Sequence, residues 1–248
     1  FMIGACLSQG RAQTKSAVSY KNPVVDIAMP DPTVIKAADG YFYVYATEST
    51  RNVPIMKSKD LVEWTYCNTA FTNKTRPRFE PKAGIWAPDI NYINSKYVLY
   101  YAMSVWGGEQ TCGIGVATAN SPQGPFTDHG KMFRSNEIGV QNSIDPSLLQ
   151  YEGRNYLVWG SFRGIYVIEL TADGLSIMSG TKKKRIAGTA FEAVYIHKHG
   201  DYYYMFASIG SCCQGVKSTY KVVVGRSKKV WGPYKDKTGS GRQSTCLW

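Results

Sequence analysis

Hydrophobic and polar residues alternate along most of the chain, in short runs that turn residues separate. This pattern predicts β-strands with one buried face, and the intervening Gly, Asn and Asp residues predict hairpin turns. No long segment repeats its apolar positions with the period of a helix. The sequence therefore predicts an all-β protein.

The same unit occurs four times: an acidic residue, a short apolar run, a turn and an aromatic-rich run. The four units are "DPTVIKAADGYFYVYAT" from Asp31, "DINYINSKYVLYYAMS" from Asp89, "DPSLLQYEGRNYLVWGS" from Asp145 and "EAVYIHKHGDYYYMFAS" from Glu192. They recur roughly every 50 residues, and further strand-like runs follow each one, which is typical of a β-propeller. Because the first strand of each blade lines the central axis, we expect the four acidic side chains to meet at one end of it.

A cluster of carboxylates can bind a hard metal ion or move protons. Calcium takes about six to eight oxygen ligands, usually from one loop, whereas these acids come from separate repeats, so proton chemistry is the better match. Glycoside hydrolysis needs one protonated and one ionised carboxyl group. Glu192 lies in the apolar run "AFEAVYI", which suits the acid, and Asp31 lies between two prolines, which suits a rigid base. Asp145 would keep Glu192 protonated, and Asp89 is expected to be structural.

Composition and charge narrow the class of partner. Hydrophobic residues make up 44% of the 248 residues and charged residues 19%, which is ordinary for a globular domain. The formal net charge is +11, and the densest basic run is "KKKR" at residues 182–185. Basic residues are not interleaved with aromatic ones and no nucleic-acid-binding signature occurs, so we expect no nucleic-acid partner. The basic surplus instead favours an anionic polysaccharide.

The six cysteines match no zinc-binding spacing, so no metal ligands are assigned. The adjacent residues Cys212 and Cys213 are expected to be two buried free thiols. No apolar run is long enough for a transmembrane helix.

The two ends of the chain differ from the repeats. Residues 1–20 resemble the end of an export signal, and "IGAC" resembles a lipoprotein box in which Cys6 would carry the lipid. We therefore expect an exported protein, whether secreted, periplasmic or held at the outer surface. We expect the propeller to span residues 21–238 and residues 239–248 to be a tail unrelated to it.

Five motifs occur in order within residues 22–234: "PDPTVI", "IWAPDI", "NSIDPSL", "FEAVYI" and "GSCCQGVKSTYKVVVGRS". Together they resemble the motifs of glycoside hydrolase family 43, and most closely those of its endo-1,5-α-L-arabinanases. The resemblance implies a five-bladed propeller that cleaves the plant cell-wall polysaccharide arabinan with inversion. It implies Asp31 as the catalytic base, Glu192 as the acid and Asp145 as the residue that sets the acid's pKa. For an inverting pair, the carboxyl groups of Asp31 and Glu192 should be roughly 6.5–9.5 Å apart.

The same resemblance implies substrate contacts beside the acids. The residues carried over from the family motifs are Trp86, Trp106, Gly107, Asn142, Ser143, Ser161 and Phe162. For the aromatic residues, packing between blades is the alternative interpretation.

The family's fifth blade should follow "WGPYKDK", together with a histidine that helps to hold a central calcium ion. Only about four blades are expected in this chain, and no histidine follows His199. The sequence therefore requires no cofactor, although family resemblance implies a structural Ca²⁺. We expect a monomer.

Three alternative functions remain open at this stage. One is an exo-acting α-L-arabinofuranosidase or β-xylosidase of the same family. Another is a carbohydrate-binding propeller that is inactive because a blade is missing, and the third is a propeller with a structural or protein-interaction role.

Overall fold

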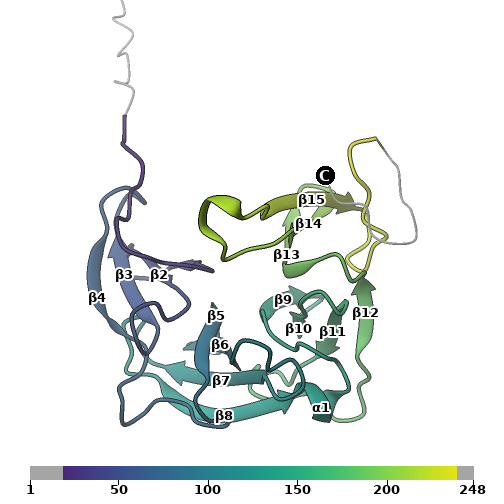
Figure 1. Ribbon diagram of the computed structural model, residues 1–248, viewed down its shortest axis with the longest axis horizontal. Coiled ribbons are helices and arrows are strands. Elements are labelled where there is room, and N and C mark those ends of the chain that lie inside the picture. Colours follow the sequence, from purple (N-terminus) through teal and green to yellow (C-terminus); the bar gives the residue numbers. More distant parts are fainter. Residues whose placement is uncertain (1–18, 239–248) are drawn as a thin grey trace, which may run out of the picture.

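The computed structural model describes residues 19–238, and these residues form four antiparallel sheets arranged as blades around a central axis (Figure 1). The predicted all-β propeller with four blades is confirmed. No helix in the described part is long and apolar enough to cross a membrane. Most of the predicted export signal, with Cys6, and the predicted tail at residues 239–248 lie outside the described residues.

The four sheets follow one another along the chain, and their strands lie in sequence order. The first blade contains β1 (Thr33–Lys36), β2 (Phe42–Tyr45), β3 (Pro54–Ser58) and β4 (Thr65–Thr69). The second contains β5 (Gly84–Ile93), β6 (Lys96–Ser104), β7 (Gly113–Ala119) and β8 (Thr127–Arg134). The third contains β9 (Ser147–Tyr151), β10 (Arg154–Trp159), β11 (Ile165–Glu169) and β12 (Lys184–Ala187). Within the described residues, the fourth contains β13 (Glu192–His199), β14 (Tyr202–Ile209) and β15 (Lys221–Ser227).

Two short helices lie in loops, α1 (Ser135–Ile138) and the 3₁₀-helix η1 (Gly215–Lys217). Each of the four predicted units forms the first hairpin of one blade, so that β1 pairs with β2, β5 with β6, β9 with β10 and β13 with β14. The first strands are neighbours in turn, with β1 next to β5, β5 next to β9 and β9 next to β13. The starts of these strands therefore meet at the axis.

The hydrophobic core forms layers between neighbouring blades. Tyr45 and Leu99, both fully buried, belong to the layer between the first and second blades. Phe133 and Trp159 belong to the layer between the second and third blades, and their ring centroids are 5.1 Å apart. Met205 lies in a third layer, between the third and fourth blades. Each large side chain buried in this way contributes about 1.5–3 kcal/mol, which fixes the blades around the axis.

Candidate active site

Every blade has a residue in the left-handed backbone region just before its inner strand or within the first four residues of it. These residues are Asp31, Ala87, Asp145 and Ala193, with φ of 51°, 40°, 58° and 52°. All four line one axial cavity of about 500 Å³. A positive φ is uncommon for residues other than glycine. Its recurrence at four positions shows that the backbone makes the same bend in each blade. A proline follows the bend in three of the four blades and restricts it further.

This bend corrects the predicted alignment of the acidic residues. Asp31 and Asp145 occupy the bend itself, whereas alanines occupy it in the second and fourth blades. Asp89 lies two residues after the bend, and Glu192 lies one residue before it. The prediction of four equivalent acids is therefore wrong. Register irregularities in β5 and β13 displace the carboxylates along these strands, and alternation of residue types does not reveal such shifts.

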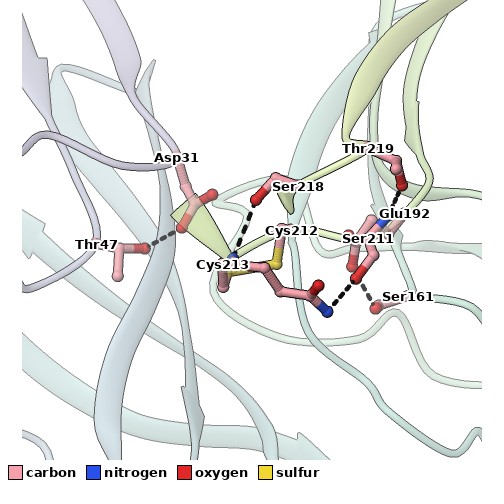
Figure 2. The surroundings of a disulfide bond; sticks show 10 residues. Asp31, Thr47, Ser161, Glu192, Ser211, Cys212, Cys213, Ser218 and Thr219 are labelled. Atoms are coloured by element: carbon pink, nitrogen blue, oxygen red, sulfur yellow. Dashed lines mark hydrogen bonds between the residues drawn. A yellow bond between two sulfur atoms is a disulfide. The ribbon is translucent and has the colours of Figure 1, made fainter. Parts of the chain in front are cut away.

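Asp31 is exposed and is held by Thr47 at the end of the first hairpin. The Thr47 hydroxyl donates a hydrogen bond of 2.5 Å to Oδ2 of Asp31 (Figure 2). The same hydroxyl oxygen accepts a bond of 2.7 Å from the backbone N–H of Ala87 in the second blade. The backbone N–H of Thr47 donates to the carbonyl of Pro30. Two blades thus fix the Asp31 carboxylate.

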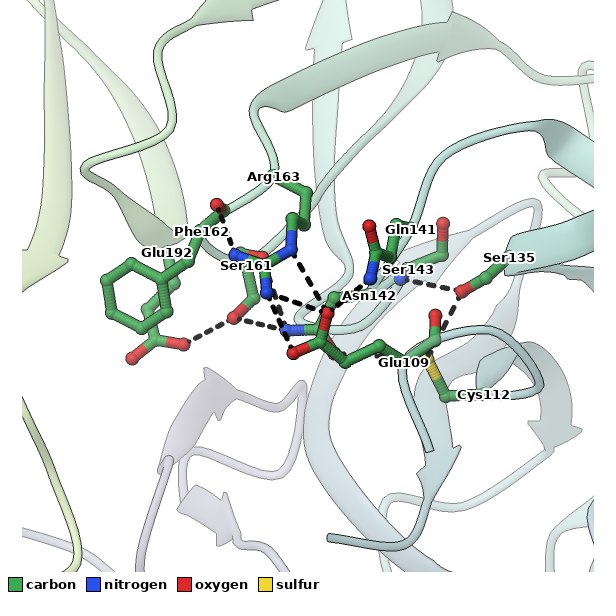
Figure 3. A network of polar contacts seen from close by, with 10 residues as sticks. All are labelled: Glu109, Cys112, Ser135, Gln141, Asn142, Ser143, Ser161, Phe162, Arg163 and Glu192. Carbon is green, nitrogen blue, oxygen red and sulfur yellow. Dashed lines mark hydrogen bonds and ion pairs between the residues drawn. The ribbon is translucent and has the colours of Figure 1, made fainter. Parts of the chain in front are cut away.

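Glu192 is buried, with 8% of its surface exposed, and is held by the third blade. The Ser161 hydroxyl donates a bond of 2.6 Å to Oε2 of Glu192. Asn142 Nδ2 in turn donates to the Ser161 hydroxyl at 2.9 Å (Figure 3). Tyr220 adds a side-chain hydrogen bond to Glu192. Because its partners come from several segments, the Glu192 carboxyl group has a defined position in the buried part of the site.

Asp145 couples electrostatically to both of the other acids. Burial raises the pKa of the Asp145 carboxyl group well above its ordinary value, and the negative charges of Glu192 and Asp31 raise it further. A hydrogen bond from the backbone N–H of Ala193 opposes this effect only in part. Three predicted acids, Asp31, Asp145 and Glu192, therefore form one electrostatic cluster, in which Asp145 retains a proton to a higher pH than an isolated aspartate does.

Asp89 is a buried carboxylate with a different environment. Its Oδ2 accepts bonds of 2.7 Å from the backbone N–H of Leu148 in the third blade and 2.7 Å from Asn91. Thr33 of the first blade supplies a further side-chain bond. Burial raises the pKa of Asp89 to about 6, although these hydrogen bonds lower it. Asp89, which also lines the axial cavity, joins three blades.

This pKa predicts a pH-dependent contribution of Asp89 to stability. Between the pKa of the unfolded chain and the raised pKa of about 6, the folded state binds more protons than the unfolded state, so stability falls as the pH rises. The loss reaches about 3 kcal/mol above pH 6. Asp89→Asn removes this ionisation and should flatten the pH dependence of urea unfolding between pH 4 and pH 7, by about the same amount. Asp201→Asn, at an exposed turn, is the control and should keep the wild-type slope; equal slopes for both variants would contradict the role of Asp89.

Two predicted aromatic contacts lie together outside the axial cavity. The ring centroids of Trp86 and Trp106 are 5.4 Å apart, and Trp106 is 77% exposed. Gly107, with φ of 80°, allows the turn that follows Trp106. Trp86 is half-buried against the small core cluster of Ala102, Cys112 and Ile144, so the exposed indole ring of Trp106 offers the stacking surface for a sugar. Phe162, with φ of 49°, lies beside Glu192 and is anchored by its backbone N–H to the carbonyl of Phe191 (Figure 3).

Two of the predicted substrate contacts are structural in this fold. Ser143 is fully buried, and its hydroxyl donates to the carbonyl of Val140 while accepting a bond from the Trp159 indole. Direct contact of Ser143 with a sugar is therefore a wrong prediction. Ser161 is also buried, and its hydroxyl contacts Glu192 rather than the open cavity.

Cys212 and Cys213 form a disulfide in the loop between β14 and β15, so the prediction of two buried free thiols is wrong. Cys213 is exposed, and the disulfide lies between Asp31 and Glu192 in the view of Figure 2. The loop closes on itself, since Ser211 and Thr219 exchange hydrogen bonds, and it leads directly into Tyr220. Of the residues in this motif, Tyr220 lines the axial cavity, and the disulfide loop precedes it.

Sequence reasoning missed Thr47 and Tyr220, which hold the two main carboxylates. One signal was available, because each of the four repeat units ends in Thr or Ser, and Thr47 and Ser161 are two of these residues. No comparable signal marked Tyr220.

Within the described residues, no group of three or more His, Cys, Asp or Glu side chains is placed to hold a metal ion.

A propeller with a coupled carboxylate cluster at one end of its axis defines a class, the glycosidases that act by acid–base chemistry. The chain belongs to glycosyl hydrolases family 43, which residues 20–243 match, so the family predicted from five motifs is confirmed. The extracellular endo-alpha-(1->5)-L-arabinanase 1 of Bacillus subtilis (strain 168) is 37% identical over 221 residues, covering 84% of this chain and 68% of that protein. The extracellular exo-alpha-(1->5)-L-arabinofuranosidase ArbA of Cellvibrio japonicus (strain Ueda107) is 36% identical, covering 84% and 67%. The solved structure of Cellvibrio cellulosa alpha-L-arabinanase complexed with arabinohexaose has a TM-score of 0.77 at 32% identity, covering 86% of this chain and 75% of that one.

Proposed function

We propose that this protein hydrolyses α-1,5-linked L-arabinan with inversion at the anomeric carbon. The observation that carries the proposal is the arrangement of three coupled acids, in which Asp31 is exposed and Glu192 is buried. Different blades hold these two side chains through the hydroxyl groups of Thr47 and Ser161. Relatives named as arabinanases and an arabinofuranosidase support the choice of substrate.

Each acid has a separate role in the proposed reaction. Asp31 accepts a proton from a water molecule whose oxygen attacks the anomeric carbon. Glu192 gives its proton to the leaving glycosidic oxygen as the bond to the anomeric carbon breaks. Asp145 acts through Glu192, since the two charges disfavour simultaneous ionisation and so keep a proton in the pair. The exposed ring of Trp106, beside Trp86, offers a surface on which arabinose units stack.

Incubation with linear arabinan and with debranched xylan tests the substrate, and the size of the products tests the mode of cleavage. We expect short arabino-oligosaccharides from arabinan and no products from xylan. Proton NMR should detect first the anomer opposite to that of the substrate, as inversion requires. Single arabinose units alone would favour the exo-acting alternative, which one relative's name supports. Binding of arabinan without any product would support a carbohydrate-binding propeller and contradict hydrolysis.

The proposed substrate places the protein outside the cytoplasm. We therefore propose that it is exported, which agrees with the word extracellular in the names of two relatives. A lipid at Cys6 and a monomeric state are finer proposals. Mass spectrometry of the protein from its native cells tests the lipid, and light scattering tests the oligomeric state.

A further inference from the structure

A second cavity, of about 420 Å³, is lined by four basic side chains and lies apart from the axial one. Its lining comprises the basic residues Arg51, Arg76, Arg78 and Lys82, together with Glu80, two prolines, one alanine and Met103. The cavity is formed by the loop between β2 and β3, the segment between β4 and β5, and Met103 of β6.

The charges of this cavity are only partly balanced. Arg76 is neutralised by Glu48, and both side chains of this ion pair are buried. Glu80 is neutralised by Arg134 at 2.6 Å and also accepts a bond from the Thr111 hydroxyl. Within residues 19–238, the remaining cations form no ion pair; they are Arg51, Arg78 and Lys82. The cavity therefore carries a surplus of positive charge that no carboxylate of the described chain offsets.

Asn73 holds two of the unpaired cations in place. Arg51 Nε donates a bond of 3.0 Å to Oδ1 of Asn73, and Arg78 Nη2 donates a bond of 2.9 Å to its backbone carbonyl. Asn73 is itself tied to the buried Asn52, whose Nδ2 donates to the same Oδ1. Each guanidinium group uses one N–H in these contacts and retains others for a ligand. A guanidinium group fixed in this way recognises a planar carboxylate with little loss of conformational entropy.

The cavity is connected to the candidate active site through two consecutive residues. Thr47 holds Asp31, and the next residue, Glu48, holds Arg76. Both also bind the start of β5, since Thr47 accepts the N–H of Ala87 and Glu48 accepts the N–H of Ile85. The two sites therefore share the segment at Thr47 and Glu48 and the strand β5. The axial carboxylates repel an acidic sugar, whereas the cavity attracts one.

We propose that this basic cavity is a subsite for the carboxylate of a uronic acid unit in an acidic polysaccharide. This inference rests on the proposed function for its choice of a polysaccharide over another anion. Arg51 and Arg78 would bind the carboxylate oxygens through their free N–H groups, and Lys82 would add its charge. The protein would thereby hold a neutral arabinan chain at its axial acids and an acidic portion of the same polymer at the basic cavity.

Binding of a galacturonic acid trisaccharide to the full chain carrying Glu192→Gln tests this subsite by calorimetry without hydrolysis. We expect that adding Arg51→Gln, Arg78→Gln and Lys82→Gln weakens binding by about tenfold or more at low salt. Binding of a neutral arabinose trisaccharide should not change. The matched control replaces Lys182, Lys183 and Lys184 by Gln, which removes the same charge from an exposed run outside the cavity, and it should bind the acidic trisaccharide within about twofold of the parent.

Lys82→Gln alone provides a second test, because its side chain makes no ion pair in the described part and the change should leave the fold intact. We expect a loss of affinity for the acidic trisaccharide of about two- to fivefold, as for one screened charge.

Equal affinity in the parent and the cavity variants, or equal losses in the cavity and control variants, would overturn the subsite. Inorganic phosphate that binds as tightly as the trisaccharide would overturn its assignment to a uronic acid. Failure of the wild-type chain to cleave arabinan, with acidic trisaccharide binding intact, would overturn the proposed function alone.

Discussion

Glu192→Gln lowers the rate of arabinan hydrolysis by about 10²- to 10⁴-fold, because the proposed general acid loses its proton while the side chain keeps its shape. The amide can still accept the hydrogen bond from Ser161, so binding of arabino-oligosaccharides should change little. The measurements are kcat on linear arabinan and the affinity for arabino-oligosaccharides from calorimetry. Glu63→Gln, the same change at an exposed position, is the matched control and should keep the wild-type rate.

The leaving group separates the roles of the two carboxylates. An aryl arabinoside with an acidic phenol needs little protonation as the bond breaks, so the Glu192→Gln variant should recover much of its rate on such a substrate. Asp31→Asn should not recover, because its proposed role is to take a proton from the attacking water. If both variants recover equally, or if neither loses activity on arabinan, the assignment of acid and base is wrong.

Glu48→Gln lowers the free energy of unfolding by about 3–5 kcal/mol, because it leaves the buried charge of Arg76 without a partner. Burial disfavours the ionised form of Glu48, but hydrogen bonds from Arg76 and from the backbone N–H groups of Asn52 and Ile85 outweigh it and lower the pKa of Glu48. A lowered pKa means that the stabilisation is present at neutral pH and is lost as the pH falls through the folded-state value. Urea unfolding at pH 7 and at lower pH measures both effects.

Glu169→Gln is the control for this second experiment. Glu169 pairs with Arg154 on the surface, where the arginine side chain is 63% exposed, so its replacement should cost about 1 kcal/mol or less. The difference between wild type and Glu48→Gln should also shrink at acid pH, where Glu48 becomes protonated. Equal losses for the two variants at pH 7 would contradict the assigned importance of the buried pair.

The repeated hairpins were predictable because strand formation follows alternation over a few residues. Thr33 pairs with Tyr45 within the first predicted unit, and Glu192 with Ser208 within the last. The meeting of Asp31 with Asp145 was predictable for the same reason, since both precede a proline at the start of an inner strand. Repetition in a sequence becomes proximity in space when the fold is a closed array of equivalent blades.

Other parts of the site were not predictable from residue patterns. Asp89 was aligned with Asp31, but irregular pairing in β5 places Ala87 at the equivalent position. Cys212 and Cys213 were expected as thiols, but the conformation of their loop joins them. Ser143 was expected to contact a sugar, but the packing of Trp159 buries its hydroxyl. Each difference arises from backbone geometry or packing that residue types alone do not encode.

By itself, the sequence determined the blade hairpins, the family and the identity of three acids that meet at the axis. Those features depend on the local alternation of apolar and polar residues and on short motifs, both of which can be recognised in the sequence without the structure. Only the tertiary structure decided which hydroxyl groups hold Asp31 and Glu192. It also decided that Asp89 is buried and bonded to the neighbouring blade. It also decided which cations lack a partner, because ion pairing in the second cavity depends on Glu48 and Glu80 reaching particular arginines. Such pairings are set by distances between blades and loops, which no single segment of the chain contains.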